Sequence, residues 1–140
     1  MHELLHGIYI QAHPEKVYQA ITTADGLRQW WTADCVVEPR VGSVAEFGFF
    51  GRKAVFRMRI DELVPSQRVV WQCVGGPDEW PGTRLTWDLS EDAGKTRVRF
   101  QQTGWPHIEG HFRPANSTWG ALMYRLKDYA EGKSPGPHFK

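Results

Sequence analysis

Long hydrophobic runs are missing from this sequence. No window approaches the roughly 18 consecutive apolar residues of a membrane-spanning helix, so we expect no membrane contact. The first ten residues, MHELLHGIYI, lack the basic start and the apolar stretch of a secretory signal peptide. We therefore expect a cytoplasmic protein.

An excess of charge of one sign is also missing. The 17 lysines and arginines nearly balance 16 aspartates and glutamates, for a net charge of +1. Binders of nucleic acid carry a basic excess, so we expect no nucleic-acid partner. The only two cysteines, Cys35 and Cys73, lie in strand-like segments and are typical of core thiols in a reducing compartment.

Motifs of known reactions are absent too. There is no glycine-rich phosphate loop, no G-x-S-x-G elbow and no carboxylate pair at a telling spacing. His107, Glu109 and His111 invite a metal or acid–base interpretation, but they lie on an apparent loop without further ligands nearby. We favour a solvated loop there, with His107 or Glu109 as a general acid left open. We expect no metal, no cofactor, and a binding protein rather than an enzyme.

Aromatic residues are abundant, at 13% of the chain with seven tryptophans. Trp30 and Trp31 stand side by side after a helical run. Adjacent helical residues point about 100° apart, so the two indoles cannot share one narrow stripe. We expect one of them in the core and the other at a cavity rim or beneath the following loop.

The periodicity of apolar residues predicts the elements. Alternation over 4–11 predicts a strand, and helical spacing from Pro14 predicts a helix that breaks at Gly26, followed by a short helical turn, LRQWW. From residue 34 onward the pattern predicts an antiparallel meander with one apolar face and one arginine-rich face. That polar face carries Arg57, Arg59, Arg84, Arg97 and Arg99. We expect it to be solvated and laced with cross-strand ion pairs.

The C-terminal region predicts one long helix with a continuous apolar stripe. The stripe consists of Trp119, Leu122, Met123, Leu126 and Ala130. This is the only element long enough to cover most of the apolar sheet face. The predicted fold class is α+β, with about seven strands, two short helices after the first strand and a long C-terminal helix. We expect one domain over 1–133 and an irregular tail over 134–140.

Three segments resemble the family named for the activator of Hsp90 ATPase homologue 1, within the START/Bet v 1-like (SRPBCC) helix-grip superfamily. They are IYIQAHPEKVYQAITTADGLRQWW, GSVAEFGF and STWGALMYRLKDYAEGKSPGPHF. The resemblance spans essentially the whole chain. It implies a curved sheet that grips the last helix, often around a hydrophobic cavity.

The aromatic interior is the main candidate site, either as a ligand pocket or as a filled core. The candidate ligand-binding residues are Trp30, Trp31, Phe47, Phe56, Met58, Trp71, Trp87, Phe100, Trp119 and Met123. Tyr9 and Tyr124 are candidate polar contacts. We expect a small hydrophobic or aromatic ligand as the partner.

Two other functions stay open. The family name implies a protein-interaction module in chaperone regulation or stress response, although we expect no chaperone-docking domain ahead of this one. Related helix-grip proteins imply cyclase- or dehydratase-like catalysis in the cavity. An exposed apolar patch near Trp80 or Trp105 would favour a protein partner or a homodimer.

Overall fold

The computed structural model describes all 140 residues as one sheet with three helices. The strands are β1 (His2–Ile10), β2 (Asp34–Val36), β3 (Val44–Phe49), β4 (Ala54–Val64), β5 (Arg68–Gly75), β6 (Arg84–Asp92) and β7 (Lys95–Trp105). The helices are α1 (Pro14–Thr22), α2 (Ala24–Leu27) and α3 (Phe112–Ala130). This order confirms the predicted α+β helix-grip fold. No helix has the length and apolar character needed to cross a bilayer.

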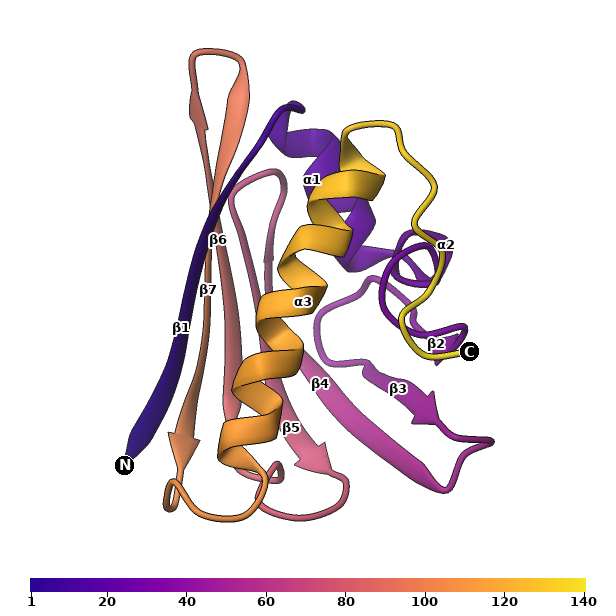
Figure 1. The fold of residues 1–140 in the computed structure, drawn as a ribbon, viewed down its shortest axis with the longest axis vertical. Coiled ribbons are helices and arrows are strands. Elements are labelled where there is room, and N and C mark those ends of the chain that lie inside the picture. The colour runs from indigo at the N-terminus through magenta and orange to yellow at the C-terminus, as the bar shows by residue number, and fades with distance from the viewer.

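The seven strands form one curved antiparallel sheet in the order β1-β7-β6-β5-β4-β3-β2. Strands β2 to β7 are neighbours in chain order, as in a meander. Strand β1 pairs with β7 and forms the edge of the sheet opposite β2. Helix α3 crosses in front of the sheet, α1 lies beside the C-terminal end of α3, and α2 lies farther along, next to β2 (Figure 1). The apolar face of the sheet is thus enclosed between strands and helices.

The break between the first two helices lies at Thr23, not at Gly26 as the sequence predicted. Thr23 is extended, and its hydroxyl accepts the Gly26 N–H at 3.0 Å as the N-cap of α2. Gly26 lies inside α2, where a Cβ atom would come within 2.8 Å of the Ala20 Cα. The glycine is therefore needed for close helix packing and not for a turn. The LRQWW segment continues as hydrogen-bonded turns after α2.

The core confirms the predicted helical stripe. All five stripe residues of α3 are buried, together with the inward-facing residues of the central strands. Trp80 lies on the β5–β6 loop and Trp105 ends β7, and both are buried, at 6% and 0% exposure. No apolar patch forms around them, because their rings pack against each other and against α3.

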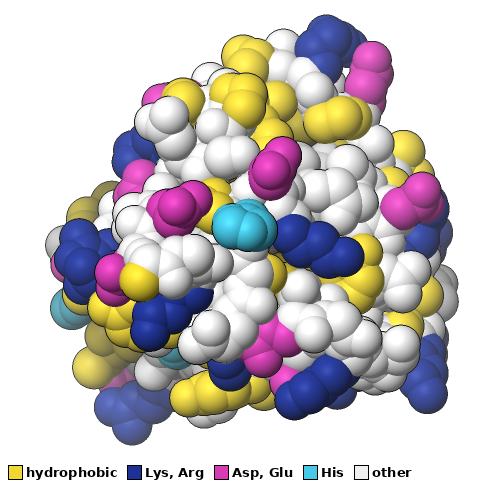
Figure 2. Space-filling view, turned by 90° about the horizontal axis from the view of Figure 1, so that it is seen from above, with side chains coloured by type: hydrophobic (Ala, Val, Ile, Leu, Met, Phe, Trp, Pro, Cys, Tyr) yellow, Lys and Arg dark blue, Asp and Glu magenta, His cyan; other side chains and the backbone are white.

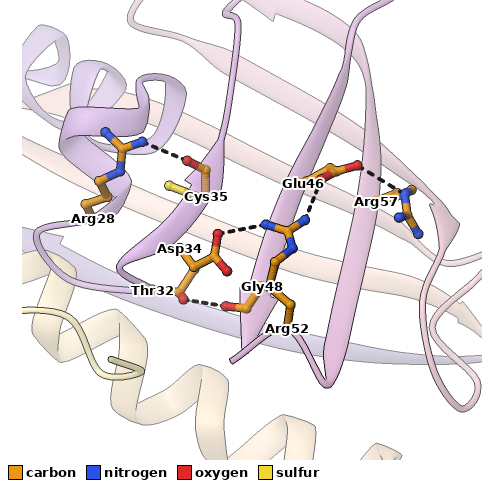
Figure 3. Close-up of polar contacts among 8 residues, drawn as sticks. All are labelled: Arg28, Thr32, Asp34, Cys35, Glu46, Gly48, Arg52 and Arg57. Carbon is orange, nitrogen blue, oxygen red and sulfur yellow. Dashed lines mark hydrogen bonds and ion pairs between the residues drawn. The ribbon is translucent and has the colours of Figure 1, made fainter. Parts of the chain in front are cut away.

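The outer face of the sheet carries the predicted ion pairs. Arg59 and Arg84 both pair with Asp61, and Arg57 pairs with Glu46. A chain of contacts runs from Asp34 through Arg52 and Glu46 to Arg57 across β2, β3 and β4 (Figure 3). Charges of both signs are also interspersed on the face seen in Figure 2. Arg97 and Arg99, in contrast, form no ion pair.

Candidate functional site

A cavity of about 360 Å³ lies between the N-terminal half of α3, the β3–β4 end of the sheet and the C-terminal tail. Ten of its fifteen lining residues are hydrophobic. The lining consists of Trp31, Phe49, Phe50, Ala54, Phe56, Pro77, Asp78, Trp80, His111, Pro114, Ala115, Thr118, Trp119, Leu122 and Phe139. Its size falls within the range of small-molecule sites.

Trp31 forms the inner wall of the cavity. Its ring stacks on the rings of Phe47 and Trp71, with 4.5 Å and 6.2 Å between ring centroids. The ring of Trp119 lies tilted against it, with 5.1 Å between centroids. Trp30, in contrast, points into the core, where its indole N–H donates to the Ala20 carbonyl at 3.0 Å. Both indoles are buried because the chain leaves the helix before Trp30 and presents both rings to the sheet.

Trp119 forms a second wall and is held by a buried polar network. Its indole N–H donates to Gln102 Oε1 at 3.0 Å, and Gln102 Nε2 donates to Thr83 Oγ1 at 2.9 Å. The Thr83 hydroxyl in turn donates to the Trp80 carbonyl at 2.7 Å. Gln102 and Thr83 are fully buried, so the network fixes the rotamer of Trp119 inside an apolar core.

The C-terminal tail supplies the third wall. It has no helix or strand, as expected, but it is docked: the Phe139 N–H donates to the Trp31 carbonyl, and the Ala33 N–H donates to the Phe139 carbonyl. The Phe139 ring meets Phe49 edge-on at 4.8 Å. Arg125 of α3 donates to the carbonyls of Pro135 and Gly136. The tail therefore belongs to the site.

The mouth of the cavity carries its few polar groups. His111 Nε2 lies 3.4 Å from Asp78 Oδ2, and both residues line the cavity. The His111 backbone N–H donates to Glu79 Oε1 at 3.1 Å, which ties the loop before α3 to the β5–β6 loop. His107 lies 3.9 Å from the same carboxylate oxygen. No group of three histidine, cysteine or acidic side chains is arranged to hold a metal ion.

The ten candidate ligand-binding residues divide into two groups. Trp31, Phe56 and Trp119 line the cavity. The other seven are buried in the packed core and do not reach it: Trp30, Phe47, Met58, Trp71, Trp87, Phe100 and Met123. Tyr9 and Tyr124 are exposed, at 47% and 65%, and neither lines the cavity.

Several lining residues escaped sequence reasoning. Phe49 continues the β3 alternation from Phe47, which gave a usable signal. Trp80 and Phe139 stand in segments without periodicity, and only their contacts with Trp119 and Phe49 bring them to the cavity. His107 and Glu109 do not line it either.

The two cysteines are free and buried. Burial raises the pKa of the Cys73 thiol to about 11 and also raises the pKa of the Cys35 thiol. Neither lines the cavity, so the site offers no thiolate nucleophile.

Comparison with known proteins places this geometry in a family. The model of the activator of Hsp90 ATPase homolog 1-like family matches residues 11–131. The chain belongs to this family. The Aha1 dimer of Colwellia psychrerythraea, solved in solution, is 35% identical with a TM-score of 0.85, and the alignment covers 94% of this chain and 98% of that one. No curated protein matches the chain.

More distant structures share the fold. Protein CV1439 from Chromobacterium violaceum is 23% identical, with a TM-score of 0.77 and coverage of 94% of this chain and 98% of that one. DynU16, a protein of the dynemicin biosynthetic locus, is 19% identical with a TM-score of 0.81, and covers 99% of this chain but 51% of its own length. The same helix-grip scaffold thus occurs in proteins of different genetic context.

Proposed function

We propose that this protein binds a small aromatic or otherwise apolar molecule in the cavity between the sheet, α3 and the C-terminal tail. The observation that carries the proposal is an aromatic-walled space of about 360 Å³ in a domain whose core is otherwise densely filled with aromatic rings. The cavity is partly open to solvent, and a ligand that covers its apolar walls removes them from water, which favours binding.

The walls suit a flat molecule. Trp31 and Trp119 are held by stacking and by the Gln102 network, so they are already in place before a ligand arrives. A two-ring aromatic that loses about 250 Å² of apolar surface to these walls gains roughly 6 kcal/mol. This gain alone corresponds to a dissociation constant of about 40 µM. Lost translational and rotational freedom offsets part of it, so we expect dissociation constants in the high micromolar to millimolar range.

A cavity-filling substitution tests the proposal. Thr118 lines the cavity on α3, whereas its neighbour Ser117 is exposed, so Thr118→Phe and Ser117→Phe form a matched pair. We expect naphthalene to quench tryptophan fluorescence in the natural protein and in Ser117→Phe. In Thr118→Phe we expect the dissociation constant obtained from the quenching curve to be at least ten times higher. Equal quenching in all three proteins, or in none, contradicts binding in this cavity.

We also propose that the chain forms a homodimer, because a 35% identical relative that covers nearly the whole chain is a dimer. The exposed apolar side chains of Leu5 and Tyr9 on one edge of the sheet support self-association. Sedimentation equilibrium measures it directly, and a monomer mass at every concentration would contradict it.

The free, buried cysteines support a reducing compartment, and we propose the cytoplasm.

A further inference from the structure

The sheet has one long unprotected edge. The strand order places β1 and β2 at the two edges, and β2 has only three residues whereas β1 has nine. In Figure 1 the N-terminal half of β1 forms the left margin of the fold with no element beyond it, whereas the β6–β7 hairpin extends past its C-terminal half. β1 contains no proline and no lysine, the residues that usually protect an edge strand from pairing.

The open part of this edge runs from Glu3 to Gly7. Lys127 Nζ donates to the Tyr9 carbonyl from α3 at 3.2 Å, so the backbone of Tyr9 faces away from β7. The backbone N–H and C=O groups of successive residues in a strand point to alternate sides. Those of Glu3, Leu5 and Gly7 therefore point to the same side as those of Tyr9, which is the open side. No side chain of the protein hydrogen-bonds to the backbone of these three.

We propose that β1 pairs antiparallel with β1 of a second copy, with the two-fold axis at Leu5. This inference rests on the proposed self-association and names its surface. The register opposes Leu5 to the partner's Leu5, and Glu3 to the partner's Gly7. Each of these pairs exchanges two backbone hydrogen bonds, and the two sheets become continuous.

Charge complementarity favours this register. Arg99 of β7 lies opposite Gly7 of β1 and opposite Asp88 of β6 on the outer face of the sheet, and it is exposed. Asp88 pairs with Arg68, and Arg99 forms no ion pair. The partner's Glu3 lies on the other side of Gly7, about 10 Å from Arg99 at the Cα atoms, or two strand spacings. Gly7 has no side chain, so an arginine and a glutamate can meet above it. Glu3 is likewise exposed and without a partner in its own chain. The two-fold axis forms the pair twice.

The apolar content of the edge fits the same arrangement. Leu5 is 63% exposed, and the two-fold axis brings it against its copy at the centre of the interface. Packing within the chain gives no reason for glycine at position 7, because a Cβ there would meet only the Val98 carbonyl oxygen at 3.9 Å. A partner strand with a salt bridge above it supplies such a reason.

Sedimentation equilibrium of the full chain and its variants tests the surface and its register. Leu5→Lys places two ammonium groups at the axis and is expected to raise the dimer dissociation constant about 100-fold. Glu3→Arg and Arg99→Glu each break both symmetric ion pairs and are expected to raise it about 10-fold, whereas the double variant restores it to within about threefold. Val36→Lys, at an exposed site on the opposite edge, is the control and is expected to change nothing.

The outcomes separate this surface from self-association itself. A natural protein that stays monomeric refutes both proposals. A dimer that resists Leu5→Lys but weakens with Val36→Lys shows self-association through another surface and refutes the β1 edge. A dimer that weakens with Leu5→Lys but is not restored by the charge exchange refutes the register at Leu5. All four positions are exposed, so an unchanged thermal unfolding curve verifies that each variant folds.

Discussion

Replacement of Gln102 by methionine tests how firmly the cavity wall is held. Methionine keeps the approximate length and volume of the side chain but removes the acceptor of the Trp119 indole N–H and the donor to Thr83. The Trp119 side chain is 1% exposed, so no water can replace the lost acceptor. A buried donor left without a partner costs about 1–3 kcal/mol, and the second lost hydrogen bond adds about 1 kcal/mol.

We therefore expect Gln102→Met to lower the free energy of unfolding by about 3 kcal/mol. In a domain of this size that corresponds to a melting temperature roughly 10 °C lower. Guanidinium unfolding followed by far-ultraviolet circular dichroism measures the change without relying on the tryptophans themselves.

A double-mutant cycle with Trp119→Phe separates the hydrogen bond from the loss of volume. Trp119→Phe removes the donor, so Gln102→Met in that background no longer leaves an indole N–H unpaired. We expect the double variant to be more stable, by about 1–2 kcal/mol, than the sum of the single effects predicts. Additive effects, or a Gln102→Met variant within about 0.5 kcal/mol of the natural protein, would refute the role given to this network.

Three further predictions follow from individual contacts. Gly26→Ala is expected to cost about 2–3 kcal/mol in denaturant unfolding, because its Cβ would lie 2.7 Å from the Gln19 carbonyl oxygen, whereas Gly120→Ala, which meets only His6 at 3.7 Å, is expected to be neutral or stabilising. Burial and the nearby Arg125 lower the pKa of His138 from its usual 6.5, so docking of the tail is favoured by the neutral imidazole and is expected to weaken as the pH falls below that value. Hydrogen exchange of the Phe139 amide reports this loss, and His138→Gln should abolish the pH dependence. Cys35 and Cys73 are expected to react with a thiol reagent at pH 8 only after unfolding, since burial raises both pKa values, and fast labelling of the folded protein would contradict this.

Much of the fold could be predicted from the sequence because its signals are local. The alternation of Phe56, Met58 and Ile60 and the helical spacing from Trp119 to Ala130 each depend on one element alone, and the structure buries all of these residues. The break at Gly26 was wrong for the opposite reason. Whether a glycine ends a helix or admits a neighbouring backbone depends on a contact with Ala20, which no local pattern records.

The boundary between core and cavity depends on contacts that are distant in the chain. Trp31 and Trp71 are both tryptophans with the same exposure, yet only Trp31 lines the cavity. The reason is that the space left between Phe139 and α3 lies next to Trp31. Phe139 also lines this space, although it is more than 100 residues away from Trp31 in the chain, and it is docked through hydrogen bonds between backbone groups that carry no side-chain signature. A sequence can therefore indicate an aromatic interior, as this one does, without indicating which of its rings a ligand would touch. That distinction arises where the tail, the β3–β4 end of the sheet and α3 meet.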